Sequence, residues 1–124
     1  MSFTLEFHDS EVRDVVADGD TVRVRFSAAS VRSAEGQHGW LPSVVLSLAQ
    51  ATLVGDVTQA FGKLADGAMR QDGRNAPRLA LPRTLAGAIE LTLRFANGTL
   101  LTMQARALAL TVTDGARFAE DLSC

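Results

Sequence analysis

Nonpolar residues at every second position, set between closely spaced turn residues, constrain this chain more than any other feature. The clearest examples are residues 21–26 (TVRVRF) and 89–95 (IELTLRF). A period of two places successive side chains on opposite faces of a strand, so each nonpolar set shares one face of a sheet. No window of a dozen residues has a comparably clean helical period. The sequence therefore predicts an all-β protein.

A length of 124 residues predicts a single domain over residues 1–124, and neither half of the chain could bury a core alone. We expect an antiparallel sandwich or small barrel of about eight or nine short strands joined by tight glycine-containing hairpins. The expected strands are residues 3–8, 11–17, 20–31, 42–54, 57–63, 68–71, 78–82, 87–96 and 99–112, with loops at 33–41 and 71–77. Segment 57–64 stays ambiguous between strand and short helix.

Three similar turn sequences suggest how neighbouring strands align, namely residues 17–19, 65–67 and 96–98. A three-residue turn with Gly98 left-handed sets Leu93 against Leu101, whereas a two-residue turn would set Leu93 against a threonine. The first register pairs nonpolar with nonpolar, so we expect it.

The same turn at Gly19 predicts Val12 opposite Val24. It also places Arg13 opposite Arg23, with Arg25 on the same outward face. We interpret this arginine row as a solvated face, with an anion site as the alternative.

Segment 43–54 (SVVLSLAQATLV) is nonpolar on both faces, which predicts that both faces are covered. A closed barrel or a second copy of the chain could provide the cover, and we expect a homo-oligomer. The candidate interface residues are Val44, Val45, Leu46, Leu48 and Leu53. The last strand changes parity through residues 105–112, which indicates either a bulge or a second pair of buried faces.

Charge and cysteine content exclude several classes of protein. Twelve basic and fourteen acidic residues give a net charge of −2, so we expect no nucleic acid and no membrane as a partner. The single cysteine, Cys124, excludes a disulfide framework and a cysteine zinc site. The first residues lack a signal-peptide pattern, so we expect a cytoplasmic protein. We expect no cofactor.

Short motifs along nearly the whole chain resemble those of a family of small uncharacterised bacterial all-β proteins. The resemblance begins at Phe7-His8-Asp9-Ser10 and continues through residues 25–40, 64–67 and 81–110. It ends at residues 116–121, an A-R-[FY]-x-E-D segment. It implies a bacterial single-domain protein, and the family carries no assigned activity to transfer.

Four residues could carry binding or chemistry: His8, Asp9, His38 and Trp40. Adjacent residues of a strand point to opposite faces, so His8 and Asp9 could pair only across a bend. Asp9-Ser10 also has the composition of a turn. The spacing of the two histidines is not that of a metal site, and we expect none. Trp40 would plug an open end of the β-structure or form one wall of a cleft.

The common catalytic patterns are missing, which favours a non-catalytic role while leaving enzymatic activity open. No serine lies in a G-x-S-x-G context, and the glycines match neither a phosphate loop nor a dinucleotide fingerprint. We therefore expect an interaction or assembly module. The alternative is a small-molecule-binding barrel, with or without enzymatic activity, whose site lies near His8 and Trp40.

Overall fold

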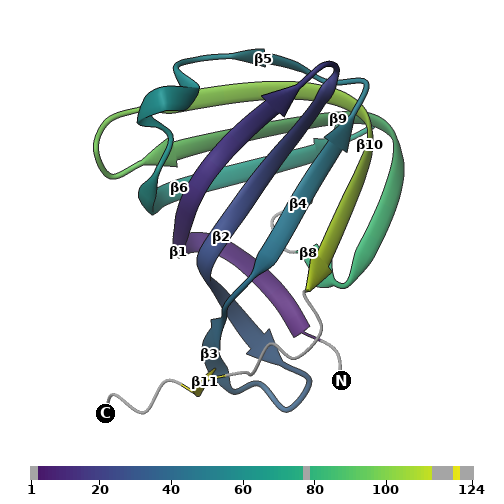
Figure 1. The fold of residues 1–124 in the computed structure, drawn as a ribbon. Coiled ribbons are helices and arrows are strands. Elements are labelled where there is room, and N and C mark those ends of the chain that lie inside the picture. The colour runs from purple at the N-terminus through teal and green to yellow at the C-terminus, as the bar shows by residue number, and fades with distance from the viewer. Residues whose placement is uncertain (1–2, 77–78, 113–118, 121–124) are drawn as a thin grey trace.

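The computed structural model describes residues 3–76, 79–112 and 119–120, and it confirms the all-β prediction. Six antiparallel strands close into a barrel in the order β1-β2-β4-β10-β9-β6, with β6 returning to β1. They are β1 (Phe3–Asp18), β2 (Thr21–Ser33), β4 (Val44–Ala49), β6 (Gly62–Gln71), β9 (Arg83–Phe95) and β10 (Leu100–Val112). Figure 1 shows β1, β2 and β4 side by side, with β6, β9 and β10 curving behind them.

Shorter elements lie on the outside of this barrel. They are β3 (His38–Leu41) on β2, β5 (Thr52–Val54) on β10, β7 (Arg74–Asn75) on β6, β8 (Leu79–Leu81) on β1 and β11 (Ala119–Glu120) on β3. A 3₁₀ helix, η1 (Val57–Gln59), precedes β6 and is capped by the Asp56 side chain, which accepts from the Thr58 amide at 2.9 Å. This resolves the ambiguous segment 57–64: a 3₁₀ turn comes first, and a strand begins only at Gly62.

Nonpolar side chains fill the interior of the barrel. Leu46, Leu91 and Met103, from three different strands, are each 0% exposed. Along each of these strands, buried nonpolar residues alternate with residues that face outward, as the sequence predicted. The interior is therefore a packed core, and a ligand site has to be sought on the outer surface.

The two predicted hairpin registers had different outcomes. Leu93 lies opposite Leu101 and Gly98 is left-handed at φ 92°, which confirms the three-residue turn between β9 and β10. The first hairpin was predicted wrongly. Asp18 pairs with Thr21, so only two residues form the turn, and Val24 lies opposite Val15 rather than Val12.

The physical reason is the position of the turn: Gly19, left-handed at φ 62°, and Asp20 form it, so every pair up to Val15 lies three positions from the predicted register. A second, one-residue shift follows near Arg13. Val12 pairs with Phe26 and Asp14 pairs with Arg25, so the intervening Arg13 is the extra residue of β1. The shift keeps both Val12 and Val15 buried. Arg13 and Arg23 are therefore not opposed, and Arg25 binds Asp14 instead, with its Nε 2.6 Å from Oδ1.

Two other expected elements are also corrected. Residues 65–67 form no hairpin turn, because they continue β6 past an irregularity between Leu64 and Asp66. The expected strand over residues 42–54 is divided where Gln50 takes a left-handed conformation at φ 51°. β4 then pairs with β2 and β10, whereas β5 pairs with β10 alone.

The pairing of β10 with β9 has one register shift, between Ala105 and Ala107. A bulge therefore explains the change of parity that the sequence has in residues 105–112. The C-terminal motif of the family resemblance at 116–121 falls outside the described residues except for Ala119 and Glu120, and Cys124 falls outside them too.

β1 closes the barrel against β6 through only two paired positions, Glu11 with Lys63 and Val12 with Gly62. Below them, Phe7 covers the backbone of Gly67, where an added Cβ would lie 2.6 Å from the Phe7 Cβ. Residues 3–5 of β1 leave the barrel to pair with β8. This closure places Lys63 beside the point where β1 changes direction, and that point organises the candidate site.

Candidate functional site

The first part of β1 and the last part of β2 continue past the barrel, where β2 pairs with β1 on one side and with β3 on the other. We call these three strand segments the extension (residues 3–8, 29–33 and 38–41). It lies at the bottom of Figure 1. Ser30 is paired with Glu6 on one side and Trp40 on the other. Directly opposed residues share a face, so these three side chains form one row on the outside of the sheet. Thr4, Arg32 and His38 form the next row.

A bulge at Asp9 and Ser10 separates the extension from the barrel part of β1. Asp9 is left-handed at φ 69°, a conformation that aspartate tolerates better than most residues. Ser10 is fully buried, and its hydroxyl donates to the Glu6 carbonyl at 2.7 Å and accepts from the Ser30 amide at 2.8 Å. The serine side chain thus replaces the ladder hydrogen bonds that the bulge interrupts.

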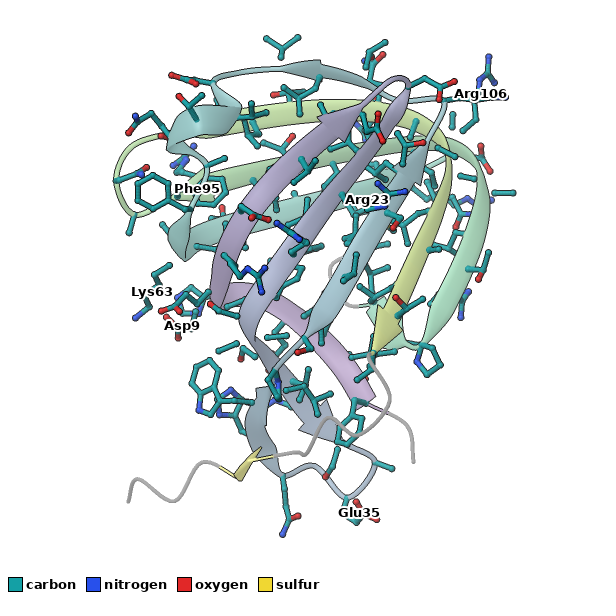
Figure 2. The ribbon with its side chains drawn as sticks, in the orientation of Figure 1. Asp9, Arg23, Glu35, Lys63, Phe95 and Arg106 are labelled. Atoms are coloured by element: carbon teal, nitrogen blue, oxygen red, sulfur yellow. The ribbon has the colours of Figure 1, made fainter. Side chains whose placement is uncertain are left out.

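The bulge also supplies the bend that a His8–Asp9 pair requires. His8 Nδ1 lies 3.1 Å from Asp9 Oδ2, and Lys63 Nζ lies 3.1 Å from the other carboxylate oxygen. Figure 2 shows the Lys63 and Asp9 side chains together beside the barrel. Two strand segments far apart in sequence, in β1 and β6, are therefore tied together at one corner.

An open cleft of about 380 Å³ lies over the outer face of the extension. Its walls are Glu6, His8, Asp9, Ser30, Arg32 and His38. Arg32 Nε is 3.1 Å from Glu6 Oε1, and the Glu6 side chain is the more sheltered partner, at 24% exposed against 46% for Arg32. A charged pair thus lies along one wall of the cleft.

His38 is held in place on the other side. The Ser30 hydroxyl lies 2.7 Å from His38 Nε2, and the Trp40 ring meets the imidazole edge-on, with centroids 5.1 Å apart and planes at 74°. Ser30 is only 2% exposed. The imidazole therefore has a defined orientation at the edge of the cleft, with an aromatic neighbour beyond it.

The four residues singled out from the sequence all lie in this region. His8, Asp9 and His38 line the cleft, and Trp40 packs against His38. Sequence reasoning missed Glu6, Ser30 and Arg32 as site residues, because nothing in the residue types marks them. Period-2 alternation would have placed each on the outer face once the pairing of β1 with β2 was known.

The candidate interface residues are divided between the two faces of β4 and β5. Val44, Leu46 and Leu48 lie inside the barrel at 0% exposed, so they cannot contact another molecule while the barrel is closed. Val45 and Leu53 are half-buried and are the members with accessible surface.

Metal-binding geometry, membrane-spanning helices and similarity to known proteins add few constraints on the function. Among residues 3–76, 79–112 and 119–120, no group of three or more histidine, cysteine or acidic side chains has the geometry to hold a metal ion. In the same part of the chain, no helix is long and nonpolar enough to cross a bilayer. Neither a family model, nor a curated protein, nor a solved structure matches this chain.

Proposed function

We propose that this protein is a non-catalytic binding module that takes a small polar ligand in the cleft of the extension. One observation carries the proposal: His8, Asp9 and His38 meet Glu6, Ser30 and Arg32 around a single cleft, although Glu6 and His38 are 32 positions apart in the chain. Sites that bind small molecules combine a concave surface with a few convergent polar groups. Because the barrel interior is packed, the outer cleft is the better candidate.

The geometry of Ser30 and His38 favours binding over nucleophilic catalysis. A Ser–His pair at 2.7 Å has the spacing of an activated nucleophile, but a nucleophile must reach a substrate. Ser30 is 2% exposed, and its amide is already bound to Ser10. That amide is thus not available to stabilise an oxyanion. The pair orients the imidazole instead.

A fragment screen tests this proposal directly. Saturation-transfer difference NMR would compare the wild type with Arg32→Ala/His38→Ala and with a matched control, Arg23→Ala/Arg94→Ala, whose arginines lie on the exposed outer face of the barrel. We expect polar fragments that bind the wild type and the control but lose their signal with the cleft variant. Absence of hits, or equal hits for both variants, would contradict the proposal.

We also propose that the protein forms a homo-oligomer through the outer side of β4 and β5. Val45 and Leu53 are half-buried there, and Val54 is 73% exposed beside Thr102 of β10. Leu100, two residues before Thr102, is 49% exposed. Light scattering with size-exclusion chromatography tests this, and a monomer at micromolar and higher concentrations would count against it. The resemblance to bacterial proteins and the scarcity of cysteine support a bacterial cytoplasmic setting.

A further inference from the structure

The charges around the cleft are balanced and already paired. Two carboxylates, Glu6 and Asp9, face two cations, Arg32 and Lys63, at 3.1 Å each. All four side chains keep part of their surface exposed, from 24% for Glu6 to 62% for Lys63. Partly exposed ion pairs contribute little net stability, so they can exchange partners at low cost. A ligand can therefore enter between them.

The net gain from exchanging ion-pair partners depends on whether the ligand carries one charge or two. An anion that takes Arg32 leaves the Glu6 carboxylate, which is three-quarters covered, without its partner. A cation that takes Glu6 leaves Arg32 without its own. A ligand with a single charge thus gains one attraction and forfeits another, so its net gain is small. A ligand with both charges replaces one ion pair by two and leaves neither side chain unmatched.

We propose, as a refinement that rests on the proposed function, that the cleft binds a small zwitterion of the free α-amino acid class. The ammonium group pairs with Glu6 and the carboxylate pairs with Arg32, which can offer more than one N–H to a carboxylate. The imidazole of His38, fixed by Ser30 and backed by Trp40, provides an aromatic surface at the edge of the cleft for the ligand's side chain.

The size of the cleft agrees with this class. About 380 Å³ lies at the lower end of the range for small-molecule sites. An amino acid or a compound of similar size fits that volume.

Three probes that differ only in charge test the proposal. L-Phenylalanine carries both charges, phenylpropionate carries the carboxylate alone and phenylethylamine carries the ammonium alone. Trp40 is the sole tryptophan and contacts His38 of the cleft, so its fluorescence reports binding of each probe. We expect L-phenylalanine to bind at least about tenfold more tightly than either single-charge probe.

Variants of the charged pair sharpen the test. Glu6→Gln should weaken L-phenylalanine until it binds no better than phenylpropionate, and Arg32→Gln should weaken it until it binds no better than phenylethylamine. Arg23→Gln is the matched control, because Arg23 lies in the barrel part of β2, the strand that carries Arg32. It should leave all three affinities unchanged. Circular dichroism of each variant verifies that the strands remain folded.

The outcomes separate this refinement from the proposed function. Equal or tighter binding of a single-charge probe would overturn the zwitterion while leaving a binding cleft. Binding of L-phenylalanine that survives both glutamine variants would overturn the assigned contacts and the zwitterion class with them. If none of the probes binds while the fragment screen still yields hits in the cleft, the ligand class is wrong. If the screen is empty as well, the binding function itself fails.

Discussion

The β1–β2 hairpin contains two regions that differ although they belong to the same pair of strands. In the barrel region, Val12, Val24 and Phe26 face a packed interior. The extension also buries one face, through Leu5 and Val31, but its other face carries the charged and aromatic residues of the cleft. The Asp9–Ser10 bulge separates the two regions. One local irregularity in β1 therefore divides a structural half of the hairpin from the half that we propose as the binding half.

The largest expected effect is a loss of stability in the barrel region. Phe26→Ala removes a ring that is 2% exposed, and a substitution of this kind destabilises a protein by about 3–5 kcal/mol. Denaturation by urea would measure the loss. A loss below about 1 kcal/mol would contradict the packed interior. If the variant does not fold, the smaller substitution Phe26→Leu should fold and still show a measurable loss.

The next largest effect is a loss of stability at the bulge that separates the two regions. Ser10→Ala leaves the Ser30 amide and the Glu6 carbonyl without their partner, and an unsatisfied buried group costs about 1–3 kcal/mol. Ser27→Ala is the matched control, since the Ser27 hydroxyl bonds Glu11 at an exposed position and should cost less than about 0.5 kcal/mol. Equal losses for the two variants, again from urea denaturation, would show that the bulge does not depend on Ser10.

A smaller effect on stability is expected for the ion pair of the extension. Glu6→Gln and Arg32→Gln should each change the free energy of unfolding by less than about 1 kcal/mol, because the pair is partly exposed. The same substitutions should weaken ligand binding strongly. A large loss of stability without a loss of binding would identify the pair as a structural tie.

The smallest effect concerns the surface of the barrel region. The hydrogen bond from Arg25 holds the pKa of Asp14 below its ordinary value of 3.8. A carboxyl group with a depressed folded pKa stabilises the fold above its unfolded pKa and loses that contribution as the pH falls through the folded pKa. The contribution is therefore complete well above pH 3.8 and is lost progressively as the pH falls from there through the lower folded pKa.

Asp14→Asn and Arg25→Gln remove the same ion pair, so both should flatten the acid limb of the stability profile slightly and to the same extent. Thermal unfolding between neutral and acid pH measures this. An acid limb identical to that of the wild type in both variants would mean that the pair does not contribute.

Alternation and turn residues predicted the all-β class and the β9–β10 register, because both depend on nonpolar residues at regular spacing. They failed at β1–β2, where Gly19 and Asp20 form a two-residue turn in place of the expected three-residue one and so displace the pairing by three positions. They also missed Glu6, Ser30 and Arg32, whose role depends on which residues lie opposite each other. His8, Asp9, His38 and Trp40 were found from residue type alone, but their convergence required the bulge and the pairing with β3.

Chemical-shift mapping of the backbone amides with a ligand that binds this protein is the most direct measurement of where the ligand sits. We expect the largest shifts at His8, Ser30, Arg32 and His38, with little change at residues that line the barrel interior, such as Leu46 and Leu91. Shifts concentrated at Leu46 and Leu91 would place the ligand inside the barrel and contradict the division of the hairpin into a structural half and a binding half.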